Sequence, residues 1–180
     1  MCSGSYGSAP PTNALLVTHR GRRLEQWGGY HDCFRICVSG RVTLQQFVAA
    51  FYTSWLFRLE RALLRVFLAI PSSDADAYAL ARGTRNTFAA WYVGARTPTE
   101  LLMCDRYERT RSWFRVGPDG DGDTELCFGS AVAGRRRANG SFAMSPSFRA
   151  LLGFHVLYSQ LLLQATARSL AALGATKSVL

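Results

Sequence analysis

Lysine is almost absent from this sequence of 180 residues: Lys177 is the single example, and arginine supplies the other 20 of its 21 basic residues. With 12 acidic residues, the formal net charge is +9. Proteins that bind nucleic acid often gather their cations in one stripe or run. Here the arginines are spread along the chain, with one cluster at Arg135, Arg136 and Arg137. We therefore expect no dedicated nucleic-acid partner, although arginine-mediated binding to an anionic membrane or nucleic acid remains an alternative.

The sequence also lacks the usual patterns of secretion, membrane spanning and metal binding. Among its five cysteines, Cys33 and Cys37 are separated by three residues, but no second pair of Cys or His residues at zinc spacing accompanies them. The N-terminal residues lack the basic segment and apolar core of a signal peptide. Glu60 and Arg61 interrupt one long apolar segment, and His155 interrupts the other. Glycine-rich phosphate loops are absent too. We expect a cytoplasmic protein with reduced thiols and without metal or cofactor. A peripheral membrane contact is an open alternative. The sequence predicts no particular oligomeric state.

Apolar residues make up 48% of the sequence and aromatic residues 12%, which suffices for one core in a chain of this length. Residues 1–13 are rich in Ser, Gly and Pro, so we expect a flexible N-terminal tail there. Residues 14–180 are expected to form a single domain. A short apolar run at its start predicts an edge strand within residues 14–27.

Two patterns follow in the first half of the chain. Alternation with a period of two predicts a strand at Tyr30–Val38. A helical apolar pattern then continues as far as Pro71, and Thr43 with Gln46 forms a capping box at its start. Because the pattern is broken near Ser54, it predicts either two helices or one kinked helix.

The middle of the chain returns to strand patterns. A short helix is predicted between the N-cap Ser73 and Gly83. From Thr87 to Val132 the period is two, and turn signals lie near residues 97–99, 108–109 and 117–123. These turns divide the stretch into four antiparallel strands.

Hairpins at these turns would place Trp91 opposite Asp105, and Asp105 opposite Ser112. The inner face of the sheet then carries Asp105, Ser112 and Ser130 in a row among apolar side chains. Burying a carboxylate without a partner costs several kcal/mol. Asp105 is therefore either a core aspartate satisfied by Ser112 or an arginine, or a polar anchor for a ligand in an apolar pocket.

The last apolar segment predicts a long closing helix at Ser145–Leu173, capped by its first residue and stopped by Gly174. Phe154, Leu157 and Leu161 flank its main apolar face, so we expect the helix to be covered on more than one side.

His155 and Tyr158 lie on this helix where it would face the polar row. A lone histidine in an apolar helix is either a packed core residue or a group that moves protons near neutral pH. Asp105 and His155 together would form an acid/base pair, although no nucleophile motif accompanies them.

One strand, paired helices, consecutive antiparallel strands and a long C-terminal helix follow one another between Tyr30 and Leu173. In this order the chain resembles the START-like (SRPBCC) superfamily, which includes the Bet v 1-like proteins and the polyketide cyclase/dehydratase proteins. The resemblance implies an α+β helix-grip fold, in which a curved antiparallel sheet has a helical insertion after its first strand and a long C-terminal helix packs on the sheet. It also implies a hydrophobic cavity between that helix and the sheet. Because the superfamily shares no catalytic residues, no role transfers position by position.

We therefore expect a protein that binds a small, largely apolar ligand, similar to a lipid, a polyketide or an aromatic compound, in that cavity. The predicted ligand-binding residues are Trp91, Asp105, Ser112, Phe114, Phe128, His155 and Tyr158. The alternative is an enzyme of the cyclase or dehydratase type that uses Asp105 or His155 as general acid/base.

Overall fold

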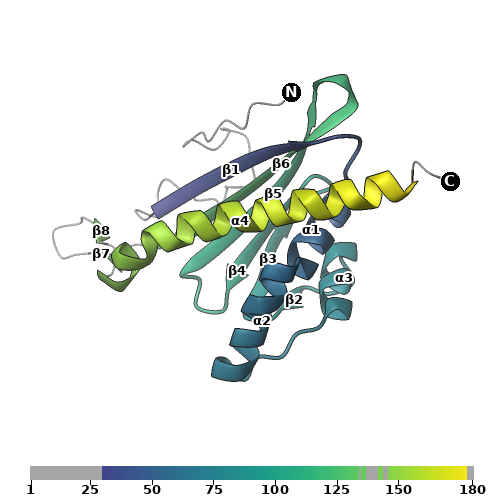
Figure 1. The fold of residues 1–180 in the computed structure, drawn as a ribbon. Coiled ribbons are helices and arrows are strands. Elements are labelled where there is room, and N and C mark those ends of the chain that lie inside the picture. Colours follow the sequence, from purple (N-terminus) through teal and green to yellow (C-terminus); the bar gives the residue numbers. More distant parts are fainter. Residues whose placement is uncertain (1–29, 134, 137–141, 144–145, 178–180) are drawn as a thin grey trace.

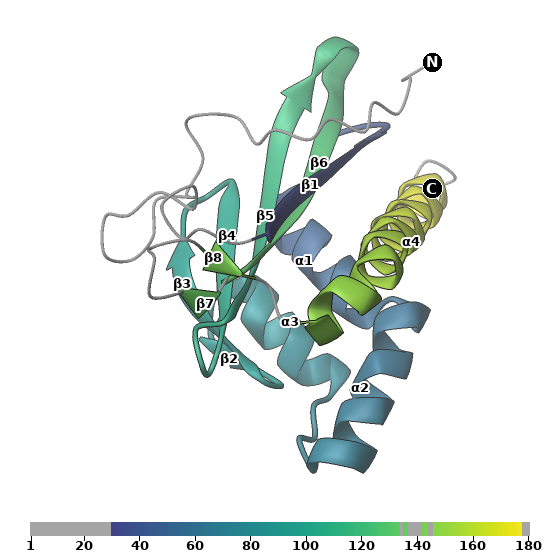
Figure 2. The same ribbon diagram turned by 90° about the vertical axis from the view of Figure 1, so that its left-hand side faces the viewer.

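The computed structural model describes residues 30–133, 135–136, 142–143 and 146–177. The tail predicted at residues 1–13 and the edge strand predicted within residues 14–27 lie outside these ranges. The described chain is α+β, with a six-stranded antiparallel open sheet and four helices. Figure 1 shows the longest helix, α4, crossing in front of the sheet, and Figure 2 shows all four helices on the same side of it.

The first strand and the two helices after it begin where the sequence predicts. Strand β1 spans Tyr30–Val38. Helix α1 (Leu44–Thr53) begins at the capping box, in which the Thr43 side chain accepts from the backbone N–H of Gln46. Ser54 ends α1 and caps α2 (Trp55–Leu68), where its hydroxyl accepts from the N–H of Phe57. Because this cap needs extended backbone at Ser54, the segment forms two helices and not one kinked helix.

Helix α3 (Asp74–Arg82) has the predicted ends. The Ser73 side chain accepts from the N–H of Asp76, and Gly83 adopts a φ of 76°, which favours glycine. The helix packs against α1. The Arg96 guanidinium donates to the carbonyl oxygens of Leu80 and Ala81 near the end of α3. This contact joins the helix to the sheet.

Between Thr87 and Val132 the sheet contains the four predicted strands and one more, in addition to β1. They are β3 (Trp91–Arg96), β4 (Glu100–Asp105), β5 (Thr110–Asp119) and β6 (Asp123–Val132), with the two-residue β2 (Thr87–Phe88) before them. The strand order is β1-β6-β5-β4-β3-β2, so β1 pairs with the last strand of the series. A separate pair of short strands, β7 (Arg135–Arg136) and β8 (Phe142–Ala143), lies outside this sheet.

One predicted strand register is wrong. Trp91 does lie opposite Asp105, but the residue opposite Ser112 is Met103 and not Asp105. The difference is a shift of two residues between β4 and β5. Its cause is the turn, because the Asp105 carboxylate accepts from the N–H groups of Arg109 and Thr110 and so closes a four-residue connection at residues 106–109. A shift of two preserves the face of every side chain.

The closing helix, α4, spans Pro146–Lys177 and continues past Gly174, where the sequence predicted a stop. A single glycine costs a helix about 1 kcal/mol and does not by itself end a long cooperative one. The predicted N-cap, Ser145, lies outside the described ranges. The expectation that α4 is covered on more than one side is also wrong, because Phe154 is 65% exposed and Leu157 is 54% exposed.

Two hydrophobic clusters hold the described residues together. The larger one lies between the sheet and the helices and includes Phe47, Phe51 and Phe114. The smaller one includes Trp113 and Cys127 on the opposite face of the sheet. No helix in the described part of the chain is both long enough and apolar enough to cross a lipid bilayer.

Candidate functional site

A cavity of about 390 Å³ lies between the sheet, α2 and α4. This volume is within the range of small-molecule sites in proteins. Its lining comes from elements far apart in the sequence: α1, α2, β3, β5, β6 and α4. The lining includes Phe51, Tyr52, Phe57, Glu60, Trp91, Ser112, Phe128, Ser130, Phe154, His155, Tyr158, Ser159 and Leu162.

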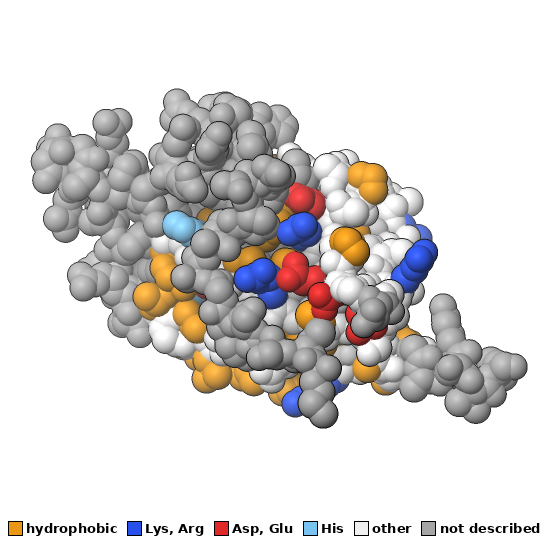
Figure 3. Space-filling model, turned by 90° about the horizontal axis from the view of Figure 1, so that it is seen from above, with side chains coloured by type: hydrophobic (Ala, Val, Ile, Leu, Met, Phe, Trp, Pro, Cys, Tyr) orange, Lys and Arg blue, Asp and Glu red, His pale blue; other side chains and the backbone are white. Residues whose placement is uncertain are grey.

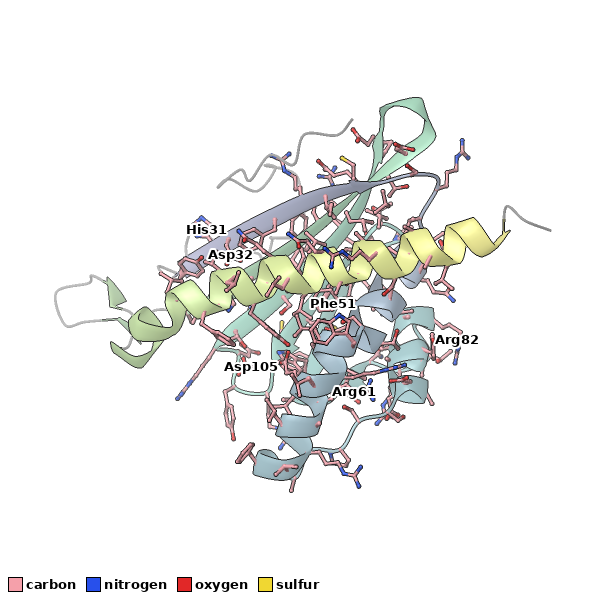
Figure 4. The ribbon with its side chains drawn as sticks, viewed as in Figure 1. His31, Asp32, Phe51, Arg61, Arg82 and Asp105 are labelled. Carbon is pink, nitrogen blue, oxygen red and sulfur yellow. The ribbon has the colours of Figure 1, made fainter. Side chains whose placement is uncertain are left out.

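Aromatic rings form one wall of this cavity. Phe51, labelled just below α4 in Figure 4, has its ring centroid 4.7 Å from that of Phe128 and 4.9 Å from that of Phe114. Tyr52 and Phe57 continue the wall, with centroids 4.8 Å apart. Phe114 is completely buried behind the lining and does not itself line the cavity. It supports the wall from within the core.

A row of polar side chains crosses the sheet beside this wall. On neighbouring strands, Asp32 lies opposite Ser130, and Ser130 lies opposite Ser112. The sequence predicted this row with Asp105 as its carboxylate. The observed register between β4 and β5 moves Asp105 out of the row, and pairing between β1 and β6 brings Asp32 into it. Ser130 is only 9% exposed, and among the described residues none bonds to its hydroxyl.

Asp32 is the best-connected carboxylate near the cavity. Its Oδ1 accepts from the backbone N–H of Ser130 at 3.0 Å, and its Oδ2 accepts from the Tyr30 hydroxyl at 3.0 Å. The Nε2 atom of His155 lies 3.3 Å from the same Oδ2. Burial, with the charge of Asp32 adding to it, raises the pKa of Tyr30, so this hydroxyl stays protonated and remains a donor.

A second carboxylate, Glu60 on α2, is a site residue that the sequence analysis did not select. It lines the cavity and accepts a hydrogen bond from the Tyr158 hydroxyl of α4. Burial raises the pKa of Glu60, although the bond from Tyr158 acts in the opposite direction. Leu56, Glu60 and Leu64 are spaced by four residues, so a helical wheel places this carboxylate on an apolar face. This spacing is the sequence pattern from which Glu60 could have been predicted as a site residue.

The cavity brings together five of the seven predicted ligand-binding residues: Trp91, Ser112, Phe128, His155 and Tyr158. Phe114 lies behind the wall, as described above. The position predicted for Asp105 in the cavity is wrong. The residue is half-buried at the end of β4, is not part of the lining, and bonds to the N–H groups of its own turn (Figure 4). It therefore serves the hairpin and forms no pair with His155.

We expect Asp105→Ala to lower the free energy of unfolding by about 1 kcal/mol, because two turn N–H groups lose a charged acceptor. Urea denaturation measures this loss. Arg106→Ala, an exposed change in the same turn, is the control and should stay within about 0.5 kcal/mol of the parent. A variant of Asp105 with unchanged stability would contradict the role in the turn.

The arginines of the described chain mostly have structural partners. Arg58 and Arg61 of α2 both pair with Asp74 at the start of α3, and Arg85 pairs with Asp76. On the face shown in Figure 3, basic and acidic side chains lie next to one another and form no single basic stripe. Arg135 and Arg136 belong to β7, and Arg137 lies outside the described residues.

Within the described ranges, no three His, Cys, Asp or Glu side chains gather closely enough to hold a metal ion. The stretch at residues 120–123 forms the turn between β5 and β6, and the Asp123 carboxylate there accepts from the N–H of Gly40.

Comparison with known proteins adds little. No protein-family model matches the chain, and no curated protein matches it in sequence. One solved structure, a conserved protein of unknown function from Enterococcus faecalis, is 10% identical; the match covers 80% of this chain and 84% of that one, with a TM-score of 0.35. A similarity of this size carries no argument about fold or function. The resemblance to the START-like superfamily therefore stays a prediction.

Proposed function

We propose that this protein binds a small, largely apolar molecule, similar to a lipid, a polyketide or an aromatic compound, in the cavity between the sheet and α4. The observation that carries the proposal is the cavity of about 390 Å³ with its aromatic wall. We further propose that the sheet and α4 form a helix-grip arrangement of the START-like kind. Its support is the order of the elements and the position of the cavity beneath the C-terminal helix.

Both the wall and the polar row support this proposal. A ligand that buried roughly 200 Å² of apolar surface against the wall would gain about 5 kcal/mol before the cost of association. Since a dissociation constant of 1 μM corresponds to about 8 kcal/mol, tight binding also needs polar contacts. Ser130 offers a buried hydroxyl for such a contact, and Ser112 and His155 lie on the same lining.

A cavity-filling variant tests the proposal. Ser112→Phe puts an aromatic ring into the space that the ligand would occupy, so we expect it to weaken binding of naphthylethanol, an apolar probe, by at least about tenfold. Isothermal titration calorimetry measures the affinity, and native mass spectrometry counts the bound molecules. Ser39→Phe, which adds the same ring at an exposed position, is the control and should bind as the parent does.

Failure of the parent protein to bind any member of a panel of apolar probes would contradict the proposed function. Equal binding by Ser112→Phe and by the parent would contradict the assigned place of binding. The melting temperature of both variants shows that each is folded.

An enzyme of the cyclase or dehydratase type is the second candidate, and one contact favours it. His155 lines the cavity, and Asp32 lies within 3.3 Å of its Nε2, where a carboxylate stabilises and orients an imidazolium. His155 would then be the general acid/base, whereas Asp105 no longer qualifies for that role. Mass spectrometry of a ligand recovered after incubation separates the two functions. Unchanged mass and structure indicate binding alone, and conversion that His155→Asn abolishes indicates catalysis.

A further inference from the structure

The carboxylate of Glu60 is the unusual group in this cavity. It lies on the lining between α2 and α4, and it accepts a hydrogen bond from the neutral hydroxyl of Tyr158. The nearest arginines in sequence, Arg58 and Arg61, pair with Asp74 instead. Among the residues that the structure describes, no cation forms an ion pair with Glu60.

Asp32, the other carboxylate beside the cavity, has a different environment. Its two oxygens already accept from the N–H of Ser130 and the hydroxyl of Tyr30, and the His155 ring lies against one of them. Both of its oxygens are therefore already engaged within the protein. Glu60 is therefore the carboxylate with capacity left for a ligand.

Aromatic rings share the cavity lining with Glu60. Tyr52 and Phe57 lie on the same lining, and the Phe57 and Trp91 ring centroids are 6.4 Å apart. On α4, the rings of Phe154 and Tyr158 are stacked with centroids 5.8 Å apart. The negative faces of such rings attract cations, and the attraction grows when the cation is removed from water. A carboxylate within an aromatic wall is a suitable environment for an ammonium group with an apolar body.

We propose that the ligand of this cavity is an amine with an apolar or aromatic body, and that its protonated nitrogen pairs with the Glu60 carboxylate. This inference rests on the proposed function, which it narrows from apolar molecules in general to cationic amphiphilic ones. The ammonium would replace the missing cationic partner of Glu60, and the aromatic wall would bury the body of the ligand.

The overall charge of +9 does not oppose this assignment. At physiological ionic strength, charges more than about 8 Å apart across solvent are largely screened. The arginines that flank Glu60 on α2 are turned toward Asp74, so their charge is partly neutralised there. Local contacts within the cavity therefore decide which head group binds.

Three probes of similar shape test the proposal: naphthylethylamine, naphthylethanol and naphthylacetic acid. We expect the parent protein to bind the amine at least about tenfold more tightly than the alcohol, and the alcohol more tightly than the acid. Calorimetry at about pH 8 keeps the amine protonated. Glu60→Gln should remove the preference for the amine and leave the affinity for the alcohol within about threefold.

Glu108→Gln is the matched control. Glu108 also accepts a hydrogen bond from a tyrosine, Tyr92, but Glu108 is exposed and neither residue is part of the lining. The variant should keep the full preference for the amine. The inference is overturned if the parent binds amine and alcohol equally or if Glu60→Gln keeps the preference. In both cases binding of the alcohol leaves the proposed function intact, whereas failure of all three probes to bind overturns both.

The same variant carries a prediction about stability. The pKa of Glu60 is raised in the folded protein, so its ionised form destabilises the fold as the pH rises through that pKa, and the effect vanishes below the unfolded pKa of about 4.3. We expect Glu60→Gln without ligand to melt roughly 2–4 °C higher than the parent at neutral pH, and no higher at about pH 4. Differential scanning calorimetry at both pH values measures this. If Glu60→Gln melted at a lower temperature than the parent at neutral pH, the ionised carboxylate of Glu60 would not be destabilising the fold.

Discussion

Phe114→Ala is expected to lower the free energy of unfolding by about 3–5 kcal/mol, a large fraction of the stability of a domain of this size. Phe114 is completely buried, and its ring centroid lies 4.9 Å from that of Phe51 and 5.2 Å from that of Phe128. Alanine would leave a cavity among the rings of α1 and β6, which are packed against one another and so have limited ability to close over it. Urea or thermal denaturation of the purified variant measures the loss.

Phe67→Ala is the matched control for this change. Phe67 lies on α2 and is 76% exposed, so the same truncation should change the free energy of unfolding by no more than about 0.5 kcal/mol. Similar losses in the two variants would show that Phe114 is not at the centre of the packing. Because both variants replace phenylalanine by alanine, the difference between their free energies of unfolding reports the effect of burial.

Asp32→Ala is expected to cost about 2–4 kcal/mol, the second largest effect. The side chain of Asp32 is 9% exposed, and its removal leaves the N–H of Ser130 and the hydroxyl of Tyr30 without their acceptor. We also expect the pKa of Tyr30 to fall toward its ordinary value, because the charge of Asp32 contributes to its rise. Chemical denaturation measures the first effect, and ultraviolet titration of the tyrosines measures the second.

His31→Ala controls for the position on β1. His31 is the exposed neighbour of Asp32 and points to the opposite face of the sheet, so its removal should have little effect on stability. A loss of stability in His31→Ala equal to that in Asp32→Ala would mean that the strand, and not the carboxylate, is sensitive. An unchanged Tyr30 titration in Asp32→Ala would contradict the contact between the two side chains.

These effects also guide the choice of variants for binding studies. Phe51 and Phe128 line the cavity and belong to the main hydrophobic cluster, so truncating either would disturb folding and binding together. Ser112 and Glu60 lie on the lining with little part in that cluster. They are the positions at which binding is best separated from stability.

Much of the fold could be predicted because its signals are local. The alternation in β1, the capping box at Thr43, the break near Ser54 and the two ends of α3 each depend on a few neighbouring residues. Five of the seven predicted ligand-binding residues lie on the lining for a related reason, because the faces of strands and helices follow from their periods. An error of two residues in the register did not move any side chain to the other face.

The chain's sequence by itself therefore determined the longer strands and helices of the described residues, the inner face of the sheet and the helix that would lie over it. Only the tertiary structure decided which polar groups meet. The turn closed by Asp105 shifted β5 along β4, the pairing of β1 with β6 brought Asp32 beside Ser130, and the contact of α2 with α4 brought Glu60 to Tyr158. Asp32 and Ser130 are 98 residues apart in the sequence, as are Glu60 and Tyr158. Periodicity describes each element alone, whereas such contacts depend on how elements pack, and so the candidate site appears only in three dimensions.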